Sequence, residues 1–177
     1  MIRPILSAAL LGAATPLLAQ VAVAEGMVDQ PCEGLAVPVP DTVLAYLKQV
    51  SRLPSGTPPL RPPAALAEYR KADREARKSD WADLCRYRAD NERLRAGPAA
   101  ARRIIFMGDS ITQFWGIDDP ALFSDGIVNR GISGQTTPQM LLRFQADVVA
   151  LKPAVVHIMA GTNDLARNTA PNSAEDY

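Results

Sequence analysis

The hydrophobic pattern divides the chain into a mainly helical first part and a second part in which strands and helices alternate. Residues 103–107, RIIFM, form a continuous apolar run, typical of a strand that is covered on both faces. Two more strands are predicted over 126–131 (GIVNRG) and 154–161 (AVVHIMAG). Strands that alternate with helices predict an α/β fold with a parallel sheet.

The segment between the second and third strands, residues 136–153, predicts a helix. We expect Thr137 as its N-cap, Pro138 as its first helical residue and Pro153 just beyond its end. The helical period places four apolar side chains on the inward face, namely Met140, Leu141, Phe144 and Val148.

The region before the strands is rich in proline and then in charge. Residues 25–63 predict a Pro-rich arm that packs on the domain and holds one short helix at 41–53. Residues 64–100 predict a helical extension, with Ser79 or Asp80 as a cap. Its many Arg and Asp side chains indicate a solvated helix surface. Three side chains of the extension are expected to share a face, namely Trp81, Leu84 and Cys85.

Residues 1–24 have the pattern of a secretory signal peptide. Arg3 precedes a long Ala/Leu stretch that ends at Ala22-Val23-Ala24, an A-x-A cleavage site. An uncleaved anchor is the alternative, because the apolar run approaches the ~20 residues that span a bilayer. Small residues, Gly12 and Pro16 favour the signal. We therefore expect a periplasmic or secreted protein without a stable membrane span after signal removal.

Charge and cysteine content narrow the possible classes of protein. Lys+Arg and Asp+Glu both number 19, which argues against a nucleic-acid partner held by bulk charge. Cys32 and Cys85 are the only cysteines, and an exported chain could join them in a disulfide worth about 4 kcal/mol. Two unpaired thiols, with Cys85 buried on a helix, remain the alternative. No zinc spacing, P-loop or carboxylate cluster occurs, so we expect neither metal nor cofactor.

Polar groups follow each of the three predicted strands. The segments are Gly108-Asp109-Ser110, residues 129–134 (NRGISG) and residues 161–164 (GTND). The carboxyl ends of parallel strands lie at one edge of a sheet, where ligands bind. Acyl transfer requires a hydroxyl nucleophile, backbone N–H donors and a carboxamide donor, and these segments supply all three.

The motifs FMGDSIT, NRGISGQTT and MAGTND resemble those of the SGNH (GDSL-type) hydrolases, in particular the lysophospholipase-like and acylhydrolase branch. The resemblance covers about residues 80–177 and implies a flavodoxin-like three-layer sandwich. It makes residues 101–177 the first half of that domain. It also implies that Ser110 is the nucleophile, and that the N–H groups of Ser110 and Gly134 and the side chain of Asn163 form the oxyanion hole.

Three neighbours of these residues are assigned structural roles. Gly131 is expected to be a turn glycine, because the family's donor is the glycine that ends Ile-Ser-Gly. Asp109 and Asp164 are interpreted as caps of the turns that they begin.

The fourth motif of the family, Asp-x-x-His, is missing from the chain. The one histidine, His157, lies six residues before Asn163 in the third strand, up to ~20 Å from the sheet edge. We expect it to be a packed core histidine. Only three of the family's roughly five strands are present, with the third strand left at an edge. We therefore expect a fold that is incomplete at its C-terminus and a chain that is the N-terminal part of a longer protein.

These observations predict an exported serine ester hydrolase that forms an acyl-enzyme on Ser110. Its partner would be a small-molecule ester, whether a lysophospholipid, a short acyl ester or an acetylated sugar. The alternative is a non-catalytic envelope module that binds glycan or acyl groups, or an inactive fragment. Without the histidine base, which can contribute about 10⁶ in kcat, residues 1–177 alone are expected to show feeble activity at most.

Overall fold

The computed structural model describes residues 31–168. The predicted signal peptide, residues 1–24, lies outside the described residues. From Cys32 onward the described residues form one compact unit. No helix within residues 31–168 is both long and apolar enough to cross a membrane.

Three parallel strands form the sheet, in the order β2-β1-β3. They are β1 (Ile104–Gly108), β2 (Ile127–Gly131) and β3 (Val155–Met159). Gly108 pairs with Gly131 on one side and with Met159 on the other, so the three strands end at one level. The predicted parallel α/β sheet is confirmed, and each strand lies within one residue or two of its expected bounds.

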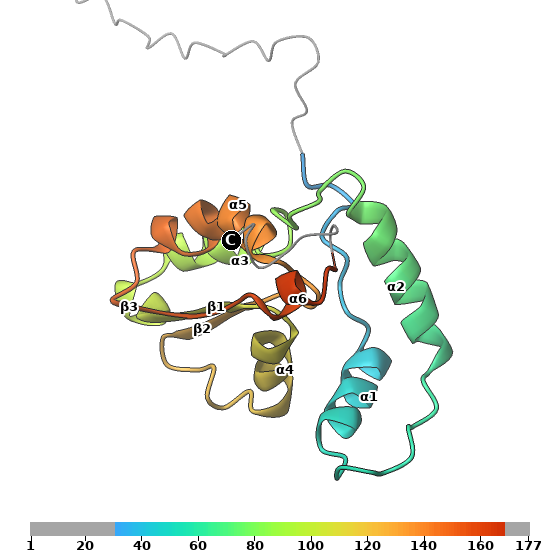
Figure 1. The fold of residues 1–177 in the computed structure, drawn as a ribbon. Helices are drawn as coiled ribbons and strands as arrows, with labels where there is room; N and C mark the ends of the chain where they lie inside the picture. Colours follow the sequence, from blue (N-terminus) through green and yellow to red (C-terminus); the bar gives the residue numbers. More distant parts are fainter. Residues whose placement is uncertain (1–30, 169–177) are drawn as a thin grey trace, which may run out of the picture. The chain divides into compact units, whose positions relative to one another are not determined.

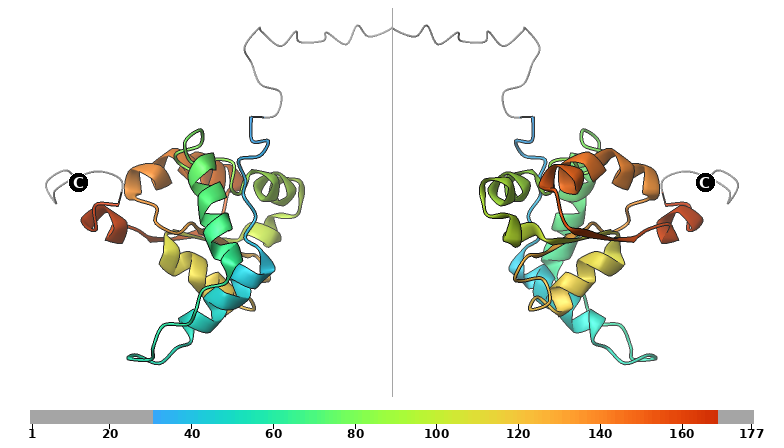
Figure 2. Two further views of the ribbon diagram at one scale, coloured as in Figure 1. Left: turned by 90° about the vertical axis from the view of Figure 1, so that its right-hand side faces the viewer. Right: turned by 90° about the vertical axis from the view of Figure 1, so that its left-hand side faces the viewer.

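Helices cover both faces of the sheet, which gives three layers (Figure 1). α3 (Arg88–Ala96) and α5 (Thr137–Asp147) lie on one face, and α4 (Ser110–Asp118) lies on the other. Short 3-10 turns, Ala99–Arg102 and Val149–Leu151, precede β1 and β3. Figure 2 shows the same layers in two views turned from the first.

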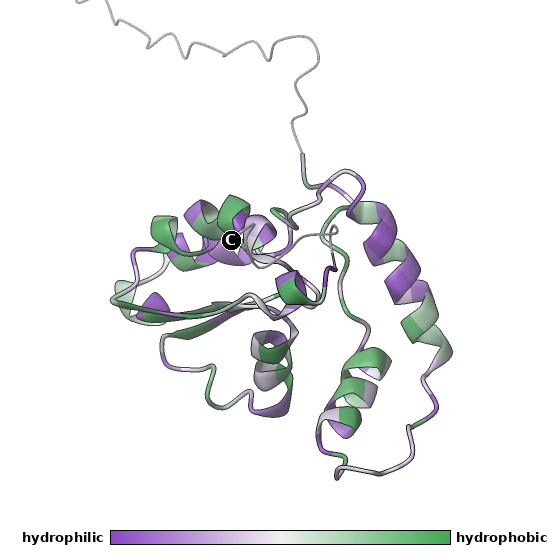
Figure 3. Ribbon diagram, in the orientation of Figure 1, coloured by the Kyte–Doolittle hydropathy of each residue, from purple (hydrophilic) through white to green (hydrophobic). Residues whose placement is uncertain are grey.

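Alternate residues of β1 pack into different layers. Ile105 and Met107 are almost fully buried and join a core beneath α3 and α5. Phe106 points to the opposite face, where its ring lies 5.5 Å from that of Trp115 and 5.4 Å from that of Phe123. Figure 3 shows β1 largely in hydrophobic colours. The apolar run therefore forms the central strand because both of its faces are covered.

The N-terminal helices are attached to this sandwich. α1 (Asp41–Ser51) packs against α4, and α2 (Ala64–Ala76) follows it. Arg52, just after α1, forms an ion pair of 2.6 Å with Asp118 at the end of α4. Cys32 and Cys85 form a disulfide, which decides between the two alternatives that the sequence left open.

The predicted inward face of α5 is partly wrong. Met140 and Val148 are buried, but Leu141 is 74% exposed. The buried stripe contains Arg143 and Asp147 instead, because the Arg143 guanidinium bonds to main-chain carbonyls at the strand ends and to the Asp147 carboxylate. A polar network, rather than apolar content alone, sets the rotation of this helix.

The predicted N-cap of α5 is also wrong. α5 begins at Thr137 with Thr136 as its N-cap, one residue earlier than expected, because Thr136 and Gln139 form a capping box.

Trp81 and Leu84 are 47% and 46% exposed while Cys85 is buried, so these side chains do not share a face. The chain turns there instead of forming a long helix, and the Asp80 carboxylate accepts from the N–H groups of Leu84 and Cys85.

Candidate active site

The turn from β1 into α4 presents Ser110 at the start of a helix. Asp109 is the N-cap, and its Oδ1 accepts from the N–H of Ile111 at 2.9 Å. The structural interpretation of Asp109 is therefore confirmed. As the first helical residue, Ser110 has an N–H without a partner inside its helix, in the field that favours negative charge.

The loop after β2 is bound closely to α4. The Gln113 side-chain oxygen accepts from both the N–H and the hydroxyl of Ser133, at 2.7 and 2.6 Å. The N–H of Ile132 donates to the carbonyl of Gly108 at 3.0 Å. These bonds fix the loop that carries Gly134 to the helix that carries Ser110.

The two glycines of this loop have different roles. Gly134 has φ +79°, a left-handed conformation that glycine adopts without strain. Gly131 is the last residue of β2, and a Cβ there would lie 2.2 Å from the Gln113 nitrogen. Gly131 is thus not the turn glycine that the sequence suggested, but a residue whose small size lets α4 approach the sheet.

The third predicted site residue, Asn163, lies on the short helix α6 (Thr162–Leu165) after β3. Its side-chain nitrogen donates to the carbonyl of Gln135 at 2.9 Å and to Oδ2 of Asp109 at 3.3 Å. The structure therefore brings Asn163 to the residue directly before Ser110. Because both amide hydrogens have acceptors here, a substrate oxygen would take the place of the longer contact, that with Asp109.

Asp164 has a structural role across two elements. Its carboxylate accepts from the N–H and the hydroxyl of Thr137, at 2.9 and 2.6 Å through Oδ1. A carboxylate beside the first turn of α5 also suits the helix dipole. The structural interpretation of Asp164 is confirmed, although the helix that it caps is α5 rather than its own.

A buried ionic network supports the strand ends, and the sequence analysis missed it. Arg143 is fully buried and donates to the carbonyls of Gly108 and Arg130 at 3.1 and 2.9 Å, to Gln135 Oε1 at 2.6 Å and to Asp147 Oδ2 at 2.8 Å. It thus contacts the ends of β1 and β2 at once. An arginine and an aspartate four residues apart on a helix that packs against the sheet were the available signal.

Arg130, a residue of β2, forms a second part of this network. It is 2% exposed and binds Asp90 Oδ2 and Asn91 Oδ1 at 2.7 Å each. Burial works against ionisation of Asp90, but the hydrogen bonds and charges of Arg93 and Arg130 outweigh it and lower the pKa of its carboxyl. Tyr87 lies under the Arg130 guanidinium and donates its hydroxyl to the Gly131 carbonyl at 2.6 Å.

His157 differs from its predicted setting. It is exposed on β3, and its ring lies 4.8 Å from that of Phe106. Among the described residues β3 pairs only with β1, so its side chains lack the cover expected of a core strand. His157 pairs in register with Phe106, two residues before the level of Gly108, which places it about 7 Å short of the strand ends.

Comparisons with known proteins bear on this arrangement. The sequence model of the GDSL-like lipase/acylhydrolase family matches residues 106–177, the stretch that contains all three motifs. Residues 106–177 are therefore similar in sequence to this family. The GDSL-like segment therefore begins inside β1 and includes Ser110, Gly134 and Asn163.

Two solved structures, a GDSL-like lipase and a putative acylhydrolase, are similar to this chain. A GDSL-like lipase from Bacteroides thetaiotaomicron VPI-5482 is 44% identical with a TM-score of 0.50, covering 54% of this chain and 47% of that one. A putative acylhydrolase from Bacteroides fragilis NCTC 9343 gives the same values.

Two curated proteins match shorter stretches. The uncharacterized lipoprotein YqeF of Bacillus subtilis (strain 168) is 58% identical over 40 residues, 23% of this chain and 16% of that protein. The acetylxylan esterase of Geobacillus stearothermophilus is 49% identical over 41 residues, 23% of this chain and 19% of that protein. The chain thus spans less than half the length of each relative.

Proposed function

We propose that the protein is an exported serine ester hydrolase in which Ser110 forms the acyl-enzyme. One observation carries the proposal: the elements that follow β1, β2 and β3 are hydrogen-bonded to one another around Ser110. Asn163 reaches Asp109, and Gln113 holds the loop of Gly134. The similarity of residues 106–177 to the GDSL-like lipase/acylhydrolase family supports the same reaction class.

In the proposed reaction the Ser110 Oγ attacks the ester carbonyl carbon while its proton passes to a base. The carbonyl oxygen becomes an oxyanion, which accepts hydrogen bonds from the N–H groups of Ser110 and Gly134 and from Asn163 Nδ2. The C–O bond to the alcohol then breaks, and the base returns the proton to that alcohol. Water releases the acyl group by the same steps and restores Ser110.

The identity of the base is part of the proposal. His157 lies over the Phe106 ring, before the strand ends, and so does not face Ser110. We assign the base to a histidine that these 177 residues do not contain. Direct contact of about 3 Å with the serine oxygen is required of any such base.

The substrate class and location follow from supporting observations. One relative is named an acetylxylan esterase, which favours a short acyl ester, such as an acetylated sugar, over a long-chain lipid. The pattern of residues 1–24 supports export, and another relative is named a lipoprotein.

A hydrolysis assay tests the proposal. p-Nitrophenyl acetate is supplied to the protein expressed from its complete natural reading frame. Ser110→Ala should abolish turnover, and Asn163→Ala should lower kcat by about 10² to 10³ with little change in KM. Ser124→Ala is the matched control, because this exposed serine bonds only locally to Ala121. Full turnover by Ser110→Ala would refute the proposal.

A further inference from the structure

A cleft of about 230 Å³ lies between the N-terminal helices and the candidate active site. Its walls come from α1, α2, the turn after α2, α4 and the loop after β2. Its lining includes the apolar side chains Leu66 and Phe114, the arginines Arg70 and Arg77, and Ser133. The residues that α1 and α2 contribute to this cleft lie outside the three GDSL-like motifs.

The cleft begins one helical turn from Ser110. Gln113 and Phe114, which line it, lie three and four residues after Ser110 on α4, and residues so spaced share a helix face. Ser133, which also lines it, directly precedes Gly134. In Figures 1 and 2, α2 stands beside the edge of the sheet at which α4 and α6 begin. A group bound in the cleft would therefore be close to a bond attacked by Ser110.

The wall formed by α2 is tied to the active-site loop. Arg77, just after α2, donates to the Ser133 carbonyl at 3.4 Å and lies 3.1 Å from Asp73 and 3.4 Å from Asp83. Arg86 donates to the Val37 carbonyl at 2.6 Å. Arg77 thus links the C-terminal end of α2 to the loop that carries Gly134.

The arginine of the cleft that is open to a ligand is Arg70. Arginines 70, 77 and 86 and the carboxylates Asp73 and Asp83 line it. The three arginines outnumber the two aspartates by one. Arg77 lies against both aspartates, and Arg86 donates to the Val37 carbonyl. Arg70 is exposed and forms no ion pair with another described residue. The cleft therefore carries one net positive charge beside an apolar floor that includes Leu66 and Phe114.

We propose that this cleft is a substrate subsite for an anionic group, carboxylate or phosphate, carried on a short apolar stem of the ester. Arg70 pairs with the anion, and the apolar floor holds the stem. A volume of about 230 Å³ is below the roughly 300–1,000 Å³ of whole-ligand sites, so the cleft takes one part of the substrate. This inference rests on the proposed function, since it names the substrate class of the same site.

Direct binding to the Ser110→Ala variant of the protein expressed from its complete natural reading frame tests the subsite without catalysis. Butyrate, propyl phosphate and uncharged butyramide are titrated, and NMR shifts of amides in residues 66–77 and 113–133 are followed. At least one anion should saturate these shifts, and butyramide should bind at least fivefold more weakly. The anion that binds more tightly shows whether the subsite takes a carboxylate or a phosphate.

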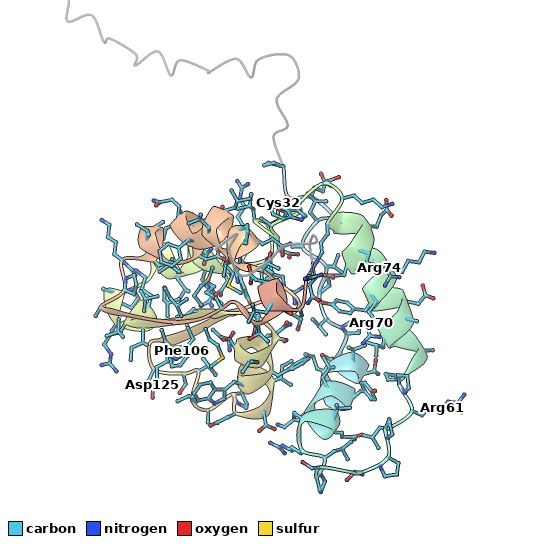
Figure 4. All side chains as sticks on the ribbon, viewed as in Figure 1. Cys32, Arg61, Arg70, Arg74, Phe106 and Asp125 are labelled. Atoms are coloured by element: carbon cyan, nitrogen blue, oxygen red, sulfur yellow. A yellow bond between two sulfur atoms is a disulfide. The ribbon has the colours of Figure 1, made fainter. Side chains whose placement is uncertain are left out.

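Two arginines on α2 provide a matched comparison (Figure 4). Arg70→Ala should weaken anion binding about fivefold to tenfold, as expected for loss of a charge-assisted hydrogen bond, and should leave butyramide unchanged. Arg74→Ala, exposed on the same helix but outside the cleft lining, should bind the anions like the parent. Circular dichroism confirms that both variants are folded.

Distinct outcomes overturn the two proposals. Absence of saturable shifts at the cleft, equal binding of butyramide, or equal effects of Arg70→Ala and Arg74→Ala would overturn the subsite. The hydrolase proposal survives those results if the protein that retains Ser110 still hydrolyses p-nitrophenyl acetate. Anion binding at the cleft in a protein whose Ser110 does not react would instead overturn the hydrolase and, with it, the role of the cleft as a substrate subsite.

Discussion

The Asn163 side-chain nitrogen lies 3.3 Å from Oδ2 of Asp109, while the other oxygen of the same carboxylate caps α4. One buried carboxylate therefore joins the candidate oxyanion donor to the turn that carries Ser110. The contact is longer than the 2.9 Å bond of Asn163 to the Gln135 carbonyl. Asp109 thus holds Asn163 near Ser110 through the longer of the two hydrogen bonds that the Asn163 amide donates.

Two substitutions of Asp109 separate its contacts. Asp109→Ala removes the cap and should lower the free energy of unfolding by about 1 kcal/mol or more, the usual cost of losing an N-cap. Asp109→Asn keeps an oxygen for the Ile111 N–H but presents an NH₂ group to Asn163, so it should lose less stability. Urea denaturation of both variants provides the measurement. Equal losses would show that the cap is not the main contribution of Asp109.

The Arg143 and Asp147 pair is expected to dominate the stability of the strand ends. Arg143→Met should cost about 3 to 5 kcal/mol, because it leaves the Asp147 carboxylate buried without its partner. The double change Arg143→Met with Asp147→Leu should recover part of that loss. A double-mutant cycle in urea measures the coupling. A loss below about 1 kcal/mol for Arg143→Met would contradict this account of the network.

Asp83 should make stability depend on pH. Burial raises the pKa of its carboxyl, against the opposing charge of Arg77 and the hydrogen bond from Gln135. The folded state therefore binds the Asp83 proton more tightly, and stability falls as pH rises from the unfolded pKa, about 3.9, toward the raised folded value.

Asp83→Asn supplies the comparison for that pH effect. Asn also tolerates the left-handed conformation at this position, φ +55°. Urea midpoints of both proteins are measured from pH 3.5 to 7. The stability of the parent relative to the variant should decline across the window above pH ~3.9. A parallel pH profile of the two proteins would contradict the raised pKa.

The disulfide should stabilise the attachment of the N-terminal segment. Cys32 and Cys85 are 53 residues apart, and closing a loop of that length contributes about 4 kcal/mol in the chain-entropy model. Cys32→Ser with Cys85→Ser should lower the urea midpoint accordingly. Dithiothreitol should lower the midpoint of the parent but leave that of the double variant unchanged. If dithiothreitol lowered the urea midpoint of both proteins, the loss of stability would not come from the Cys32–Cys85 disulfide.

The parallel sheet could be predicted because its signals are local. The β1 run is apolar on both faces, and glycine with polar residues follows each strand. The three polar segments could be placed at one edge because parallel strands share their direction. Their mutual contacts, such as that between Gln113 and Ser133, depend on tertiary packing and could not be predicted.

The buried charges were beyond sequence reasoning for a physical reason. Leu141 and Arg143 lie two residues apart, and hydrophobicity alone places the leucine inward. The structure reverses that order because Arg143 finds four acceptors: two carbonyls at the strand ends and the side chains of Gln135 and Asp147. His157 was misplaced because its surroundings depend on what pairs with β3, which is not encoded in the strand itself.

Covalent labelling of Ser110 tests the central claim most directly. The protein from the complete natural reading frame is treated with a fluorophosphonate, and the adduct is located by mass spectrometry of its peptides. Ser124→Ala serves beside Ser110→Ala, because this exposed serine bonds only locally to Ala121. We expect one adduct, on Ser110, that disappears in Ser110→Ala and persists in Ser124→Ala. A folded protein that takes up no probe, or an equal adduct in Ser110→Ala, would contradict it.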